Sequence, residues 1–174
     1  MKITDKITIT NEDNMELMAR YPDNYFNELK RVSKNQIVWG GNYFPKLWVN
    51  GCKGFIFWYK GNPVPNFADG ELAYTSFNKV AKQFDFRYYG NLSGKTSAEI
   101  KVHPTQKPIE LYKWLLDNYA KQGDKILDTH LGSMSIAIAC HDYGFELTGC
   151  ELDKEYFDKG VERITNHVKQ LSLF

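Results

Sequence analysis

Four residues in the C-terminal third of the chain could form a loop that binds a nucleotide-like cofactor. Asp128 ends an apolar run, Gly132 and Ser133 follow, and a second apolar run ends at Glu151, 19 residues after Gly132. Glycine permits a turn whose backbone N–H groups approach a ligand, and an acid about 20 residues further on can accept from ribose hydroxyls. The same residues also fit an ordinary strand-to-helix turn followed by a surface acid, and their spacing leaves both interpretations open.

The apolar pattern predicts the elements that would position these side chains. Residues 125–130 and 146–152 are typical of buried strands, and the small apolar residues of 136–143 indicate a helix between them. A helix over 108–119 precedes the loop, and a last helix begins after Asp153. Strands alternating with helices indicate an α/β fold with a doubly wound, mostly parallel sheet.

The first half of the chain is less regular. Residues 79–101 show no clear pattern, so we expect a mobile loop there. We expect the whole chain, residues 1–174, to form a single domain. Further strands are expected at residues 2–10, 37–39, 54–60 and 72–77.

Composition narrows the class of protein. With 43% hydrophobic and 15% aromatic residues, the chain should be ordered and globular. A net charge of +1 excludes a basic field over the whole surface. No run of about 20 apolar residues is present, so we expect a cytoplasmic protein without a membrane span. The three cysteines and four histidines lack metal-ligand spacing, so we expect no metal site.

A second motif, HPTQKP at residues 103–108, stands directly before the candidate loop. Together with LDTHLGSMSIAIA at 127–139, it resembles the amino-group DNA methyltransferases, which methylate adenine N6 or cytosine N4. The similarity is to the permuted subgroup whose catalytic region precedes the cofactor loop, and it extends over residues 7–167. It implies a Rossmann-like fold with permuted order and an antiparallel edge. Supporting segments are NEDNMELM, IVWGGNYF, FIFWYK and NFADGELAYTSF.

The resemblance implies S-adenosylmethionine as the cofactor and assigns roles by position. Asp13 would lie near the cofactor adenine, and Glu151 would accept from the ribose hydroxyls. Thr105, Gln106 and Lys107 would lie near the methionine part of the cofactor. The main loop would contain Asp128, Gly132 and Ser133.

Met134 departs from the family, which usually has glycine at this position. If the position requires a positive φ, methionine costs about 1–2 kcal/mol in strain. Its side chain could also fill the space of the cofactor, which makes cofactor binding an open question. Alternatively, the turn has helical geometry and Met134 simply packs.

The catalytic signature of the family is a polar residue, two prolines and an aromatic residue, which align the target amino group and stack on the flipped base. The sequence contains no Pro-Pro pair, so we assign no catalytic residue. We infer an internal deletion joined near Asn24 and Tyr25, which removed a central strand and the catalytic loop. The rest of the chain then either closes the gap or uses a second subunit as a homodimer.

Residues 79–101 combine basic with aromatic side chains, a mixture that suits DNA backbone and unstacked bases. A solvated loop over the core is the alternative. The sequence thus predicts a homologue of adenine-N6 DNA methyltransferases whose partner is double-stranded DNA. We expect this chain to transfer methyl groups slowly or not at all. The alternative is a catalytically inactive module that binds DNA, cofactor or a partner. Candidate DNA contacts are Lys79, Lys82, Arg87, Tyr88 and Lys95.

Overall fold

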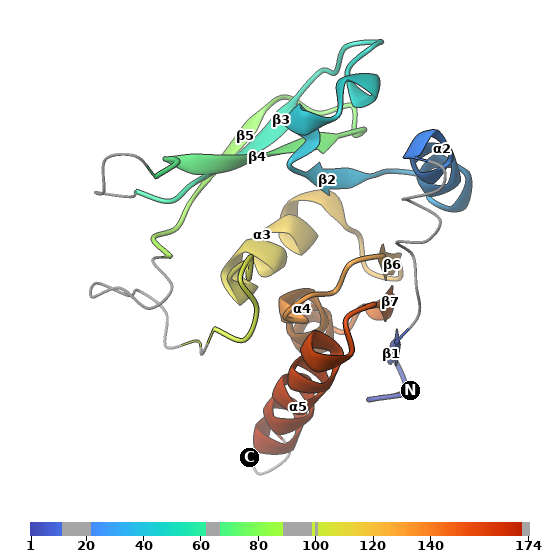
Figure 1. The fold of residues 1–174 in the computed structure, drawn as a ribbon, viewed down its shortest axis with the longest axis vertical. Helices are drawn as coiled ribbons and strands as arrows, with labels where there is room; N and C mark the ends of the chain where they lie inside the picture. Colours follow the sequence, from blue (N-terminus) through green and yellow to red (C-terminus); the bar gives the residue numbers. More distant parts are fainter. Residues whose placement is uncertain (12–21, 62–66, 89–98, 100, 172–174) are drawn as a thin grey trace. The chain divides into compact units, whose positions relative to one another are not determined.

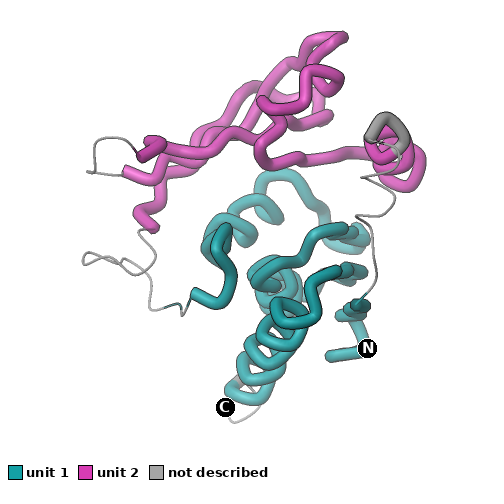
Figure 2. The backbone as a smooth tube through the Cα atoms, in the orientation of Figure 1, with its two compact units in different colours: residues 1–20, 99–174 teal, residues 21–98 magenta. Residues whose placement is uncertain are grey.

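The chain contains two compact units, shown in Figure 2. Unit 1 comprises residues 1–20 and 99–174, and unit 2 comprises residues 21–98. That residues 1–174 form a single domain stays a prediction. The structure, a computed structural model, describes residues 1–11, 22–61, 67–88, 99 and 101–171.

Unit 1 is a parallel sheet with packed helices (Figure 1). Strand β7 is central in the order β1-β7-β6 and pairs in parallel with both neighbours. Because parallel strands end at the same edge of a sheet, Asp128 at the end of β6 and Glu151 just after β7 lie at one edge. The elements are β1 (Ile7–Thr10), α3 (Ile109–Tyr119), β6 (Lys125–Asp128), α4 (Ser135–Tyr143), β7 (Glu146–Cys150) and α5 (Lys154–Leu171).

The core of unit 1 joins the sheet to one face of each helix. Its strand residues are β-branched or leucine, which suits a sheet buried beneath helices. Helix α4 contributes small residues, so it packs closely on β1 and β7. Fully or nearly fully buried members include Ile7, Ile9, Leu116, Ala137, Ile138, Leu147 and Ile164.

Asp142 at the end of α4 links helices α3, α4 and α5. Its carboxylate lies 2.6 Å from Nζ of Lys113 on α3 and 2.6 Å from Nε2 of His167 on α5. Burial by itself would raise the pKa of Asp142, but the bonds from Lys113 and His167 outweigh burial and hold this pKa below its usual value. The ionised carboxylate is therefore the form that the fold stabilises.

Asp142→Asn should lower the unfolding free energy by about 1–2 kcal/mol at neutral pH, because the amide carries no charge for Lys113 and replaces one of the two acceptor oxygens by a donor. Since the folded pKa is depressed, this stabilisation is present above the unfolded pKa of about 4 and is lost as pH falls through the folded pKa. Urea denaturation from pH 7 to pH 3 should thus show the difference between variant and native chain shrinking in acid. Asp158→Asn, which removes an exposed pair with Lys154, is the control and should change stability little. An equal effect of both variants would contradict this prediction.

Unit 2 contains a mixed four-stranded sheet in the order β2-β4-β3-β5. Strand β4 is antiparallel to β2 and β3, whereas β3 and β5 are parallel. The indole of Trp58 is buried in β3 and donates from Nε1 to the carbonyl of Phe86 at 2.9 Å. The elements are α2 (Pro22–Val32), β2 (Ile37–Trp39), the short 3₁₀ helices η1 (Gly41–Tyr43) and η2 (Pro45–Leu47), β3 (Phe55–Tyr59), β4 (Gly70–Thr75) and β5 (Lys82–Asp85).

Strand β5 corrects the expectation that residues 79–101 are irregular throughout. The strand lies at the edge of its sheet, where Lys82, Gln83 and Asp85 are exposed. An edge strand can be polar along most of its length, so it lacks the apolar alternation that identifies a strand in sequence. Residues 89–98 lie outside the described residues, and mobility of this loop stays a prediction.

Candidate cofactor site

The candidate loop connects β6 to α4 and is held against the end of β7. Gly132 and Met134 have φ values of 50° and 59°, and these left-handed residues produce the turn that begins α4. Leu131 is buried, and its N–H donates to the carbonyl of Cys150 at 3.0 Å. Its side chain packs on Gly149, where a Cβ atom would lie 2.7 Å from Cδ2 of Leu131. The missing side chain at Gly149 therefore sets how closely the loop approaches β7.

Glu151 joins the loop to the strand ends. Its Oε2 accepts from the N–H of Gly132 at 2.7 Å, and its Oε1 accepts from the N–H of Asp153 at 3.0 Å. The side-chain amide of Asn11, after β1, donates to the carbonyls of Glu151 and Leu152 at 2.8 and 2.9 Å. Each carboxylate oxygen has a further lone pair, so Glu151 can still accept from hydroxyl groups of a ligand.

Asp128 is half-buried at the end of β6 and accepts from the N–H of His130 at 2.9 Å. Burial raises the pKa of Asp128, while the His130 N–H and the charge of Lys107 act in the opposite direction. The bond to His130 orients the first residues of the loop.

The HPTQKP segment lies beside the loop. A Cβ atom at Gly132 would stand 3.6 Å from the ring of His103, and this ring also packs edge-on against Tyr156 with centroids 4.2 Å apart. Nδ1 of His103 accepts from the N–H of Thr105 at 3.2 Å, and burial lowers the pKa of His103. Both effects favour the neutral imidazole, which fixes the start of HPTQKP over Gly132.

Two of the candidate residues have inward-facing side chains. Gln106 is buried, and its Oε1 accepts from the N–H of Val102 at 2.9 Å. Ser133 is also buried, and its Oγ lies 3.1 Å from Oγ of Ser135. These two side chains therefore support the segments that contain them, whereas Thr105 is exposed and Lys107 is half-buried.

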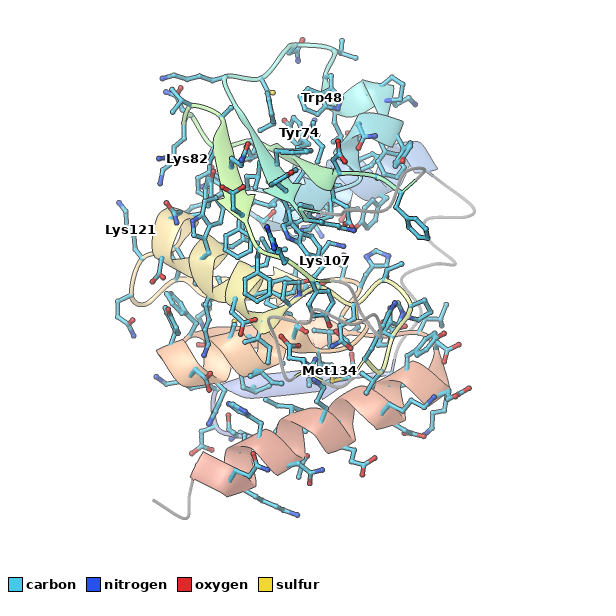
Figure 3. All side chains as sticks on the ribbon, turned by 90° about the vertical axis from the view of Figure 1, so that its left-hand side faces the viewer. Trp48, Tyr74, Lys82, Lys107, Lys121 and Met134 are labelled. Atoms are coloured by element: carbon cyan, nitrogen blue, oxygen red, sulfur yellow. The ribbon has the colours of Figure 1, made fainter. Side chains whose placement is uncertain are left out.

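Met134 has both a positive φ and a side chain that packs in the core, two features that the sequence presented as alternatives. Its φ of 59° is positive, so the strain expected of a non-glycine residue is present. Its side chain is fully buried in the core of unit 1 and packs on Gly160 of α5, where a Cβ atom would lie 2.7 Å from Cγ of Met134 (Figure 3). A side chain packed beneath the loop in this way does not fill the space on its outer side.

The remaining predictions lie in unit 2 or outside the described residues. Lys79, Lys82 and Arg87 are exposed around β5, and the ring of Tyr88 lies 6.1 Å from that of Trp58. The inferred junction at Asn24 and Tyr25 falls within α2, so the chain crosses it as a continuous helix. Asp13 and Lys95 lie outside the described residues.

A buried ion pair behind the loop is not apparent from the sequence. Arg163 on α5 bonds to Glu99, and it also donates to the carbonyl of Ser133 at 2.7 Å. No motif marks these residues, because Glu99 belongs to the segment expected to be a loop and Arg163 stands in an amphipathic helix. The one signal in the sequence is a charged residue, Arg163, between the apolar positions of a helix that is expected to pack on the sheet.

Within residues 1–11, 22–61, 67–88, 99 and 101–171, no three His, Cys, Asp or Glu side chains are grouped as a metal site would require. The helices of those residues do not combine the length and apolarity that a membrane span demands.

Comparison with known proteins identifies the family. Residues 2–162 match the model of the N6/N4 methyltransferase family, described as DNA methylase. The chain belongs to the N6/N4 DNA methylase family. Among curated members, this chain is 31% identical over 132 residues to Type II methyltransferase M2.DpnII of Streptococcus pneumoniae, covering 63% of this chain and 49% of that protein. It is 34% identical over 64 residues to Type II methyltransferase M.HpaI of Haemophilus parainfluenzae, covering 37% of this chain and 20% of that protein.

The likeness to a solved structure confirms the predicted fold class of this chain. The M1.HpyAVI–SAM complex aligns with a TM-score of 0.65 at 21% identity, covering 90% of this chain and 98% of that one. The methyltransferase fold predicted from the sequence is therefore correct. The chain spans about half the length of M2.DpnII and a fifth of M.HpaI.

Proposed function

We propose that this chain binds S-adenosylmethionine in unit 1, with Glu151 accepting from the ribose hydroxyls. The observation that carries the proposal is the 2.7 Å bond from Gly132 N–H to Glu151 Oε2, which places the acid beside the glycine turn. An acid in this position after the second strand suits a ribose, and a turn without a Cβ admits a ligand close to the backbone. A complex formed by M1.HpyAVI with SAM is in accord with this choice.

The chain's own residues would bind and orient the cofactor, which supplies an activated methyl group when bound. Gly132 and the loop backbone would contact it, and Thr105 and Lys107 are available from HPTQKP. The buried side chains of Gln106 and Ser133 would not contact the cofactor but would hold HPTQKP and the loop in place. Asp13 keeps its proposed place near the cofactor adenine.

For the substrate we propose double-stranded DNA, with adenine N6 as the ancestral target. The exposed basic residues Lys79, Lys82 and Arg87 support a contact with phosphates, and the aromatic Tyr88 stands next to them. Because the sequence has no Pro-Pro-aromatic signature, we propose that methyl transfer by this chain is weak or absent. A catalytically inactive module that binds a partner is the second candidate, favoured by the exposed side chains of Tyr43 and Val49.

Calorimetric titration should detect S-adenosylmethionine binding, while incubation with labelled cofactor and DNA should yield no methyl transfer at an ordinary turnover. The reason is that the loop and Glu151 are assembled, whereas the residues that align a target amino group are missing. Any residual methyl transfer should give N6-methyladenine rather than N4-methylcytosine, and scoring the two products separately tests this target. Met134→Gly should leave affinity within about threefold, because Met134 packs in the core and loses no ligand contact.

Two results would contradict the proposal in different ways. Methyl transfer at an ordinary turnover would refute the loss of catalysis but leave cofactor binding intact. If calorimetry detects no S-adenosylmethionine binding to the native chain or to Met134→Gly, cofactor binding is refuted. The catalytically inactive module is then the remaining candidate. Sedimentation of the same samples, with and without duplex DNA, reports whether that module forms a homodimer or binds DNA.

A further inference from the structure

Arg163 is placed to control the shape of the cofactor loop from behind. Its Nη1 donates to the carbonyl of Ser133 at 2.7 Å and to Oγ of Ser135 at 2.9 Å, and its Nη2 donates to Glu99. The Arg163 and Glu99 side chains are only 13% and 10% exposed. A guanidinium has a rigid planar fork, so one side chain can fix the loop carbonyl, the first residue of α4 and the carboxylate at the same time.

Glu99 extends this network to HPTQKP. Its Oε1 accepts from the N–H of Ile109, the first residue of α3, at 3.0 Å. Its Oε2 lies 3.3 Å from Nε2 of Gln106, whose Oε1 in turn accepts from Val102 N–H. One buried carboxylate therefore contacts a residue inside HPTQKP and the residue that follows it, while its partner Arg163 contacts the cofactor loop.

We propose that Arg163 and Glu99 are positioning residues that hold the loop at Ser133 and the HPTQKP segment in a single arrangement for cofactor binding. The proposal rests on the proposed function, because it assigns a role to residues behind that site. Neither side chain touches the ligand. The pair instead turns the Ser133 carbonyl inward, which fixes the peptide planes of the loop and keeps HPTQKP beside it. Loss of the fork would leave a buried carbonyl and a buried carboxylate with weaker partners.

A purely structural role would predict lower stability and nothing specific to the loop. Asp142 provides a matched control, since this partly buried carboxylate also joins α3, α4 and α5 through its bonds to Lys113 and His167. It lies near the C-terminal end of α4, whereas the loop leads into the N-terminal end of this helix. Variants of the two networks should therefore differ at the loop even where they lower stability equally.

The test compares Arg163→Gln, Arg163→Lys, Glu99→Gln and Asp142→Asn in the full chain. Calorimetry gives the affinity for S-adenosylmethionine, thermal melting gives stability, and hydrogen exchange gives protection of amides 131–136. We expect Arg163→Gln and Arg163→Lys to weaken binding about tenfold and to speed exchange in this segment, because neither provides the fork. Glu99→Gln keeps an oxygen for Ile109 N–H and should lose about threefold, and Asp142→Asn should stay within about twofold.

Each outcome decides between positioning and general stability. Equal loss of affinity in Arg163→Gln and Asp142→Asn, or unchanged loop exchange in Arg163→Gln, would overturn the proposal. If the native chain binds no S-adenosylmethionine, the proposed function fails, but hydrogen exchange still tests the positioning role. Faster exchange at 131–136 in Arg163→Gln and not in Asp142→Asn would then support positioning of the loop, and equal exchange would refute it.

Discussion

Gly160→Ala should lower the unfolding free energy by about 2–3 kcal/mol, although alanine favours helices over glycine by about 1 kcal/mol. The reason is Met134. A Cβ atom on residue 160 would lie 2.7 Å from Cγ, 2.9 Å from Sδ and 3.0 Å from Cε of that side chain. Met134 is fully buried and begins α4 in a left-handed conformation, so it cannot move without disturbing the loop.

The same substitution should become neutral or stabilising when Met134 is glycine. Met134→Gly relieves about 1 kcal/mol of backbone strain but removes a buried side chain worth about 2–5 kcal/mol, so alone it should destabilise the protein. Alanine at position 160 then partly fills the cavity and adds its helix preference. The two changes should thus be strongly non-additive, by about 2 kcal/mol or more.

Urea denaturation of the native chain, both single variants and the double variant measures this coupling. Glu162→Ala is the control on the same helix, since Glu162 is exposed, and should change stability by less than about 0.5 kcal/mol. Additive effects of Met134→Gly and Gly160→Ala would show that Met134 does not pack on Gly160.

The packing of Met134 illustrates what the sequence could predict. The departure from glycine was visible in sequence, and so was the consequence for backbone strain, because both are local. The position of the side chain was not, since it depends on Gly160 in a different helix. Strands β6 and β7, by contrast, have compact apolar runs, and Glu151 stands at a spacing set by one strand–helix–strand unit, so these were predictable.

The parts that escaped prediction depend on long-range contacts or on edges. Strand β5 is polar because it borders its sheet, and its sequence carries no alternation. Arg163 and Glu99 are separated by 64 residues and meet only when α5 and HPTQKP pack around the loop. The roles of Gln106 and Ser133 follow from the family resemblance and stay predictions, whereas their burial depends on the direction in which each side chain points.

Glu151→Ala should weaken S-adenosylmethionine binding about a hundredfold, which corresponds to about 2.7 kcal/mol. Alanine would remove the acceptor of Gly132 N–H at 2.7 Å and of Asp153 N–H at 3.0 Å, besides the proposed partner of the ribose. Glu151→Gln keeps one oxygen for Gly132 and should lose about tenfold. Glu146→Ala, at the opposite end of β7 in an exposed pair with Lys125, is the control and should bind normally.

S-adenosylhomocysteine and its 2′-deoxy analogue separate the ribose contact from other causes. S-adenosylhomocysteine lacks the sulfonium charge, so an equal loss with this ligand would exclude simple charge attraction between Glu151 and the cofactor. Removal of the 2′-hydroxyl should weaken binding to the native chain but should matter little in Glu151→Ala, because the acceptor is already gone. If the deoxy analogue loses the same affinity in both proteins, Glu151 does not bind the ribose and acts only by holding Gly132 and Asp153.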